Sequence, residues 1–346
     1  MNVLFNCNNT AFQSPGGGEI LLLKTKEFLN KEKVNVKLFD QWNDKLQDFN
    51  ILHNFGLSKN CYDLINITNV KKIPIVLTPI YSWPSLKFAI KSGHTLKNKI
   101  NLSFYALYHN INFLNKYTIV KKILEKSNKI LPDSNAEIDL LIKKFKIKKE
   151  KFQRIPNGVD EKFYNSNKKE FIDKFNLEDF VLYVGRIESR KNVLNLIKIF
   201  NHLNIKLVII GDYLPQSKEY YDLCKKLAKK NIHFLGKIDH ESSLLKSAYA
   251  AAKVVVLPSW LETPGLSALE GGLAGANIVI TSRGSACEYF RDYAYYINPF
   301  DNNDIKNKIL KAFNNEKNKG LKEHIKKNFL WSTVAKHIKE VYRSII

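Results

Sequence analysis

The chain has 346 residues, of which 45% are hydrophobic and 25% are charged. This length favours two domains of about 150–200 residues, each able to bury a core, and the composition is typical of a globular protein. No segment approaches about 18 uninterrupted apolar residues, which excludes a membrane-spanning helix. The formal net charge of +22 favours anionic partners, namely nucleotides, phosphorylated lipids, an acidic membrane surface or nucleic acid.

Two further features of the composition point to the cytoplasm. The first residues form a short apolar run without a basic leader, which predicts a strand and no signal peptide. The four cysteines are not spaced as metal ligands or as a redox pair, so reduced thiols are expected rather than a disulfide framework.

Short apolar runs alternate with longer amphipathic ones along the chain. In the first half we expect strands at 3–6, 35–39, 49–53, 73–78 and 129–132, with a helix near 20–31 after the first of them. Turn residues at 155–160 interrupt the pattern. It restarts with strands expected at 180–184, 206–211, 232–235, 254–258, 278–281 and 294–297, and a helix at 192–201. The last stretch, 333–346, predicts an amphipathic helix with Val334, Ile338, Val341 and Ile345 on one face.

This alternation predicts an α/β protein with two Rossmann-like, doubly wound domains. We place the first at 1–160, joined by the C-terminal helix at 327–346, and the second at 161–326. Two such domains facing each other form a cleft. Because ligands bind at the carboxyl ends of parallel strands, the residues of interest should lie just after strands.

Two glutamates flank the expected start of a helix after the strand at 254–258. Glu262 lies in the loop, Gly265 opens the helix and Glu270 lies one to two turns inside it. A helix N-terminus offers free N–H groups that suit a diphosphate, and two carboxylates at this spacing suit the hydroxyls of a nucleotide sugar. The alternative is one solvated glutamate and one that caps its own helix.

A basic turn follows the strand at 180–184. Gly185 permits close approach of the backbone to a ligand, Arg186 offers a planar fork of donors for phosphate, and Lys191 offers a point charge. The alternative is a basic loop on a basic protein.

Two weaker motifs also follow strands. Gly16–Gly18 could direct backbone N–H groups of Gly17 and Gly18 towards a phosphate, although the motif is neither a P-loop nor a dinucleotide fingerprint. Arg283–Glu288 follows the strand at 278–281 and has a simple loop as its alternative. The sequence has no HExxH, no CxxC and no Asp-x-Asp pair, so we expect no bound metal and no cofactor.

The motifs together resemble a known family. In chain order they are the glycine loop, Asn157-Gly-Val-Asp160, Gly185-Arg-x4-Lys191, Phe234-Leu-Gly-Lys237, Glu262-x7-Glu270 and the C-terminal amphipathic helix. Over essentially the whole chain, this order resembles the retaining GT-B glycosyltransferases called GT4, or glycosyl transferases group 1. The resemblance implies a metal-independent hexosyltransferase that retains the anomeric configuration, with the final helix crossing back to the N-terminal domain.

The resemblance also implies roles for particular residues. Arg186 and Lys191 would bind the donor diphosphate and, with Glu262 at the transferred sugar, act in catalysis. Glu270 would hold the ribose. Backbone contacts to phosphate would come from Gly265, Leu266 and Ser267, and the base would lie near Leu235–Ile238, which makes Ile238 a donor-binding residue.

The chain departs from the family pattern at two places. Thr263-Pro264 follows the first glutamate where the family usually has Gly or Ser and then Phe, so the sugar pocket differs. Ile80, Tyr81 and Ser82 follow the strand at 75–78, where many members carry a histidine, which leaves the general base unassigned. His53, His94 and His109 lie elsewhere in this domain and are expected to be structural or surface residues.

The sequence therefore predicts transfer from a nucleotide-diphosphate sugar, UDP- or GDP-linked, to a glycan or lipid-linked acceptor in cell-surface polysaccharide or lipopolysaccharide synthesis. Between residues 51 and 124 there are ten Lys and one acid, with Tyr81, Trp83 and Phe88 as exposed-looking aromatics, which favours peripheral binding to an anionic inner membrane face. The alternatives are a donor-binding but catalytically weak homologue and a basic nucleic-acid-binding protein. Nucleic acid is not expected because no recognition motif is present. A dehydrogenase is disfavoured because a dinucleotide fingerprint is absent.

Overall fold

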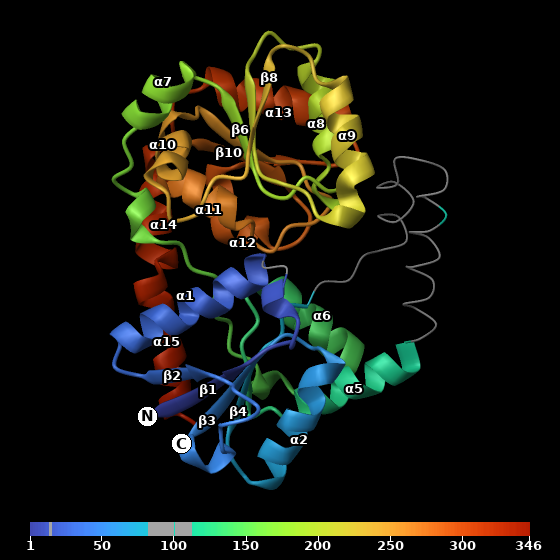
Figure 1. Ribbon diagram of the computed structural model, residues 1–346, viewed down its shortest axis with the longest axis vertical. Coiled ribbons are helices and arrows are strands. Elements are labelled where there is room, and N and C mark those ends of the chain that lie inside the picture. The colour runs from blue at the N-terminus through green and yellow to red at the C-terminus, as the bar shows by residue number, and fades with distance from the viewer. Residues whose placement is uncertain (14–15, 82–99, 101–112) are drawn as a thin grey trace. The chain divides into compact units, whose positions relative to one another are not determined.

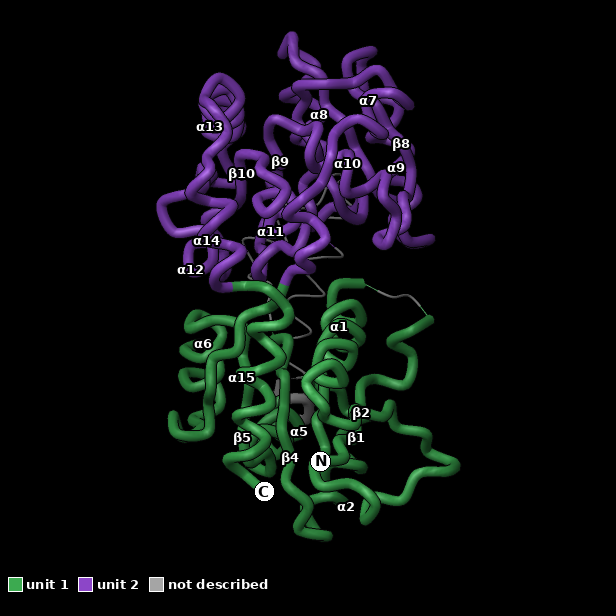
Figure 2. The backbone as a smooth tube through the Cα atoms, turned by 90° about the vertical axis from the view of Figure 1, so that its left-hand side faces the viewer, with its two compact units in different colours: residues 1–83, 107–158, 329–346 green, residues 84–106, 159–328 purple. Residues whose placement is uncertain are grey.

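The chain folds into two compact units of α/β architecture (Figure 2). The computed structural model describes residues 1–13, 16–81, 100 and 113–346. Within these residues, the first unit comprises 1–13, 16–81, 113–158 and 329–346, and the second comprises 100 and 159–328. The boundaries fall after residues 158 and 328, against 160 and 326 as placed from the sequence.

The first unit contains a five-stranded parallel sheet (Figure 1). Its order is β2-β1-β3-β4-β5, with neighbouring strands paired in parallel. The strands are β1 (Asn2–Asn6), β2 (Asn35–Leu38), β3 (Ile51–Phe55), β4 (Ile75–Thr78) and β5 (Lys129–Ile130). The helices are α1 (Gly17–Lys31), α2 (Tyr62–Val70), α5 (Phe113–Lys126), α6 (Asn135–Phe145) and α15 (Trp331–Arg343).

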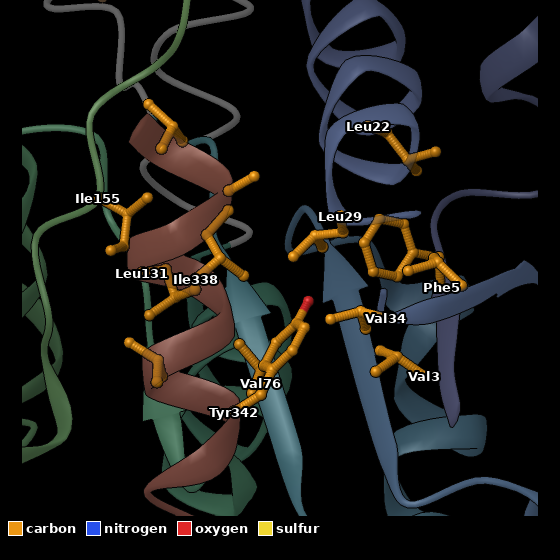
Figure 3. Packing of buried hydrophobic residues seen from close by; sticks show 14 of the residues in the cluster. Val3, Phe5, Leu22, Leu29, Val34, Val76, Leu131, Ile155, Ile338 and Tyr342 are labelled. Carbon is orange, nitrogen blue, oxygen red and sulfur yellow. The ribbon is translucent and has the colours of Figure 1, made fainter. Parts of the chain in front are cut away.

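Successive strand residues point to opposite faces of the sheet, and each face has its own core. Val3, Phe5 and Val76 pack on the face covered by α1 and α15, where Figure 3 shows the side chains of both helices converging on the strands. Leu4 and Leu77 pack on the opposite face, together with buried residues of α2, α5 and α6. Hydrophobic burial on both faces explains why these strands read as continuous apolar runs.

The C-terminal helix α15 is part of the first unit. Val334, Ile338 and Val341, which the sequence places on one face, are all buried in the core with α1. The Asn-Gly-Val-Asp turn needs a glycine at position 158, because a Cβ there would lie 2.4 Å from the ring of Trp331. The helix ends at Arg343, so Ile345 lies beyond it but still packs against the same core.

The second unit contains a six-stranded parallel sheet in the order β11-β10-β9-β6-β7-β8. Strands β7, β9 and β10 are buried along their whole length, as expected for a sheet covered on both faces. The strands are β6 (Val181–Val184), β7 (Leu207–Ile210), β8 (Ile232–Gly236), β9 (Val254–Leu257), β10 (Asn277–Thr281) and β11 (Tyr295–Ile297). The helices are α7 (Lys169–Phe175), α8 (Val193–Phe200), α9 (Lys218–Leu227), α10 (Ser243–Ala251), α11 (Leu266–Leu273), α12 (Ala286–Phe290), α13 (Asn302–Asn314) and α14 (Lys319–Phe329).

The expected elements are present, with shifts at their ends. Helix α1 begins at Gly17, three residues before its expected start, because Glu19 Oε2 accepts the backbone N–H of Gly16 at 2.6 Å and caps the first turn. Strand β3 is displaced by two residues and β5 is shortened to two residues. Within the described ranges, no helix is long and apolar enough to cross a membrane.

Candidate functional site

Four loops of the second unit carry the polar residues that the sequence singles out. Residues 185–191 follow β6, 237–240 follow β8, 259–265 follow β9 and 282–285 follow β10. All of these strands are parallel, so their carboxyl ends lie at one edge of the sheet. The fold therefore gathers the four loops at that edge.

The loop after β6 is fixed by close backbone contacts. Gly185 has a φ of +155° and Gly211, after β7, a φ of +150°. A Cβ on Gly211 would lie only 1.9 Å from the carbonyl oxygen of Gly185, so the two loops can meet only if that position is glycine. The Tyr183 hydroxyl donates to the carbonyl of Arg186 at 2.7 Å, which holds the half-buried Arg186 in place.

Lys191 and Glu262 form a buried ion pair between the loops after β6 and β9. Lys191 Nζ lies 2.6 Å from Glu262 Oε1, and their side chains are 17% and 6% exposed. The Ser259 hydroxyl donates to the same oxygen at 2.5 Å. Burial alone would raise the pKa of Glu262, but the charges of Lys191 and Arg190 and the two hydrogen bonds outweigh it, so its pKa is lowered. Glu262 is therefore a carboxylate at neutral pH.

The backbone around Glu262 is held by the loop after β10. Glu262 N donates to the carbonyl of Arg283, and Ser285 N donates to the carbonyl of Glu262, each at 3.1 Å. Gly284 has a φ of +105°, and a Cβ there would lie 2.0 Å from the Glu262 carbonyl oxygen. The Arg283–Glu288 motif thus serves at least to position Glu262. The Thr263–Pro264 peptide bond that follows is cis.

Helix α11 begins immediately after this loop. Gly265 is its N-cap, with a φ of +90°, and a side chain there would meet Leu257 at 2.9 Å. Leu266 and Ser267 form the first turn and are half-buried. The first N–H groups of a helix lack intrahelical partners, which makes this turn suitable for an anion.

Glu270 lies inside α11 at the centre of a second cluster. Its Oε1 is 2.6 Å from His240 Nε2, and its Oε2 accepts the Tyr249 hydroxyl at 2.6 Å. The hydrogen bond with Glu270 is the largest influence on His240 and raises its pKa, although burial opposes it. Burial and the Glu270 charge raise the pKa of Tyr249 well above its ordinary value, so its hydroxyl stays a donor. Neither glutamate is solvated, and the alternative reading of this motif as surface and capping residues is wrong for both.

The structure brings some of the expected residues of the second unit together. Lys191 and Glu262 are in contact, and Gly265 and Glu270 share one loop–helix segment. Ile238 is half-buried two residues after β8. Gly17 and Gly18 open α1 in the first unit, and their part in donor binding stays a prediction. The absence of a metal also stays a prediction.

Three side chains of the site were not found from the sequence. Ser259 hydrogen-bonds to Glu262, and His240 and Tyr249 hydrogen-bond to Glu270. The position of Ser259 and His240 just after strands was an available signal. Tyr249 lies within α10 and reads as a core residue, so no pattern distinguishes it.

In the first unit, Tyr81 differs from its expected exposure and His53 agrees with its expected structural role. Tyr81 is not an exposed aromatic. It is half-buried, lies 5.7 Å from the Phe145 ring in an edge-on contact and donates its backbone N–H to buried Glu137 at 2.5 Å. His53 is a structural residue as expected: it is fully buried, bonds the Tyr342 hydroxyl at 2.5 Å, and burial lowers its pKa to about 3. His94, His109, Trp83 and Phe88 lie outside the described residues.

The sequence of the second unit is similar to a known family. Residues 165–329 match the family model described as Glycosyl transferases group 1. All the loops that form the two glutamate clusters lie within the matched residues.

Curated relatives and solved structures extend this likeness. An uncharacterized glycosyltransferase of Methanocaldococcus jannaschii is 31% identical over 189 residues, which cover 48% of this chain and 45% of the relative. A Campylobacter jejuni α-1,4-N-acetyl-D-galactosaminyltransferase, named for an acceptor on diphospho-undecaprenol, is 36% identical over 99 residues, 27% of this chain and 26% of the relative. The chain spans about half the length, or less, of the curated relatives it matches.

The whole chain superposes on solved structures. Anabaena HepE, crystallised with UDP and with UDP-glucose, aligns with TM-scores of 0.72 and 0.70 at 16% identity, covering 99% of this chain and 100% of HepE. This likeness establishes the fold, which is GT-B with two parallel-sheet α/β domains.

Proposed function

We propose that the protein is a retaining, metal-independent glycosyltransferase that takes a sugar from a nucleoside-diphosphate sugar. The observation that carries the proposal is the pairing of Lys191 with buried Glu262 directly before the N-terminus of α11, inside the group 1 domain. A cation and a helix N-terminus suit a diphosphate, and an ionised carboxylate suits sugar hydroxyls. HepE, which shares the fold, was crystallised with UDP-glucose.

The proposed chemistry uses charges rather than a protein base. The acceptor hydroxyl oxygen forms a bond to the anomeric carbon while the bond from that carbon to the phosphate oxygen breaks. The electron pair of the broken bond goes to the phosphate, which also takes the proton of the acceptor hydroxyl. Arg186 and Lys191 stabilise the negative charge that develops on the leaving diphosphate. Glu262 orients the sugar through its hydroxyls, and Glu270 binds the ribose.

A panel of sugar nucleotides tests the donor site. Thermal unfolding is measured with UDP-, GDP-, ADP- and CMP-sugars, and a true donor at a hundredfold excess over its Kd stabilises the protein by about 2.7 kcal/mol. Lys191→Ala should abolish this response, while Lys198→Ala, an exposed lysine on α8, should keep it. If no sugar nucleotide raises the melting temperature of the unaltered protein, the donor proposal is wrong.

Product analysis tests the reaction. NMR of the first-formed product should show the anomeric configuration of the donor, and activity should persist in EDTA. Inversion, or loss of activity in EDTA, contradicts the mechanism. Donor binding without transfer or hydrolysis would identify the protein as a donor-binding, catalytically weak homologue.

For the acceptor we propose a glycan carried on a lipid diphosphate at an anionic membrane surface. The support is the name of the Campylobacter relative and the net charge of +22. Transfer to a lipid-diphosphate-linked glycan in anionic vesicles is compared with transfer to the free glycan. A clear preference for the vesicle-borne acceptor that declines at high salt is expected, whereas equal turnover of the two contradicts the proposal.

A further inference from the structure

The side chain of His240 lies between two carboxylates. Its Nε2 is 2.6 Å from Glu270 Oε1, and its Nδ1 is 3.3 Å from Glu241 Oε1. A neutral imidazole donates from only one of its nitrogens, whereas an imidazolium donates from both. The geometry therefore suits the charged form of His240.

The carboxylate of Glu270 keeps acceptor capacity beside this histidine. A carboxylate has about four acceptor positions, and His240 and Tyr249 each use one of them. Within the part of the chain that the structure describes, two positions remain, which equals the number of hydroxyls on the vicinal diol of a ribose. The diol can therefore bind Glu270 without displacing His240.

Charge favours the same arrangement. A nucleoside diphosphate is an anion, and a lone buried carboxylate near its binding site would repel it. An imidazolium at 2.6 Å offsets that charge while leaving the carboxylate oxygens as acceptors.

We infer that His240 is a positioning residue, which, as an imidazolium held by Glu270 and Glu241, orients Glu270 for a nucleoside ribose and offsets its charge. This inference rests on the proposed nucleotide site and adds a residue and a pH dependence to it. The affinity for a nucleoside diphosphate should therefore be high while His240 is protonated and should fall as it loses its proton.

The charged and titratable groups around His240 determine where this fall occurs. Glu270 on α11 raises the pKa of His240 most through its hydrogen bond and again through its charge, and Glu241 raises it further. Burial and the charge of Lys162, near the start of the second unit, lower the pKa of His240. Tyr249 on α10 faces the far oxygen of Glu270 and stays neutral. The net pKa is raised above its ordinary value, so the protonated form and the tight binding that depends on it extend to higher pH than for a free imidazole and are lost as pH rises through the raised pKa.

The experiment is calorimetric titration at fixed ionic strength between pH 7 and about pH 9.5, and the affinity at each pH is corrected for the proton equilibria of the probe itself. The probes are UDP, GDP and ADP, with inorganic pyrophosphate as a probe that has no ribose. The variants are His240→Gln, which keeps a donor without the charge, and His240→Ala, which removes both. His202→Gln, at an exposed histidine just after α8, is the matched control.

For the nucleoside diphosphate that binds most tightly, the unaltered protein and His202→Gln should lose about fivefold in affinity across this range, the difference between a charged and a neutral hydrogen bond. His240→Gln should be weaker at pH 7 by about the same factor and insensitive to pH, and His240→Ala weaker still. Pyrophosphate affinity should change little with either variant. Because His240→Gln preserves a hydrogen bond, it provides the decisive comparison even if His240→Ala unfolds.

Three results overturn the inference. Affinity that does not depend on pH, or that depends on pH equally in His240→Gln, assigns His240 to packing alone. Affinity that rises with pH means that the ribose displaces the histidine. If the unaltered protein binds none of the nucleoside diphosphates at any pH, the proposed function itself fails and the inference with it, which separates this failure from the other two.

Discussion

Glu262 and Glu270 lie eight residues apart on either side of the start of α11, yet they are held by different chemistry. Both are buried, and both have a partner at 2.6 Å. The partner of Glu262 is the ammonium group of Lys191. The main partner of Glu270 is His240, an imidazole whose pKa is raised by this contact, and its second partner is a neutral tyrosine.

The two clusters therefore differ in how their charge depends on pH. A lysine–carboxylate pair keeps its charges as pH changes, which suits contact with the reacting sugar and phosphate. A histidine–carboxylate pair responds to protonation, which suits tuning of affinity at a part of the donor that does not react. Variants that alter one cluster and leave the other intact can test the distinction.

The largest effect is expected from breaking the Lys191–Glu262 pair. Lys191→Ala leaves a carboxylate that is buried without its cation, which should cost about 3–5 kcal/mol of unfolding free energy. It also removes charge from the leaving diphosphate, which should reduce the transfer rate about 100- to 1000-fold. Urea unfolding and initial rates measure the two effects, with Lys198→Ala as the control.

The double variant Lys191→Met/Glu262→Gln separates stability from catalysis. Removing both charges should restore most of the lost unfolding free energy without restoring transfer. If Lys191→Ala unfolds at the same urea concentration as the unaltered protein, the pair makes no net contribution and Glu262 is not a constrained carboxylate.

The second effect concerns Glu270. Glu270→Gln should weaken nucleoside diphosphate binding about 10- to 100-fold, because hydrogen bonds to a charged acceptor are replaced by bonds to a neutral amide. Stability should change less, since the amide oxygen can still accept from Tyr249. Calorimetric titration with the best-bound nucleoside diphosphate measures the loss, and Glu219→Gln, at an exposed glutamate on α9, is the control. Unchanged affinity would remove Glu270 from the donor site.

The sequence predicts the positions of these groups better than their contacts. Lys191 and Glu262 were found because polar residues that follow strands of one parallel sheet must lie at one edge. The apolar runs also gave each strand of both sheets, with errors only at the ends. The pairing of Lys191 with Glu262 depends on how the two loops turn, and that is decided by distant glycines: Gly211 contacts Gly185, and Gly284 contacts Glu262.

The sequence did not predict which side chains of different elements contact each other. Tyr249 and Glu270 are 21 residues apart on α10 and α11, and no periodicity shows that their side chains meet. The burial of Tyr81 was missed for the same reason: it was expected to be exposed and instead packs on Phe145 of α6. The part of Gly17 and Gly18 in donor binding remains a prediction.

A smaller effect is expected in the pH dependence of stability, and its sign differs between the clusters. The lowered pKa of Glu262 means that its pair stabilises the fold above its ordinary value of 4.5 and that this contribution is lost as pH falls through the lowered pKa. The raised pKa of His240 means that its pair stabilises the fold fully below 6.5 and that this is lost as pH rises through the raised pKa.

Urea midpoints from pH 3 to 10 for the unaltered protein, Glu262→Gln and His240→Gln measure both effects. Glu262→Gln should differ most from the unaltered protein near neutral pH and converge with it in acid. His240→Gln should differ most in mild acid and converge with it in alkali. Convergence of both variants on the same side of neutrality would contradict the assignment of opposite pKa shifts.

The smallest expected effect compares the two hydroxyl groups that donate to the glutamates. Ser259→Ala removes a donor from Glu262 Oε1, but Lys191 remains bonded to that same oxygen. Tyr249→Phe removes the donor to Glu270 Oε2, while His240 remains only on Oε1. The tyrosine change should therefore cost more, about 1.5 kcal/mol of unfolding free energy against about 0.5 kcal/mol for the serine change. Tyr249→Phe preserves the ring contact with Phe163, so lost packing does not contribute. Equal costs in urea unfolding would mean that water replaces the tyrosine hydroxyl, and a larger cost for Ser259→Ala would mean that Lys191 depends on Ser259 for its own position.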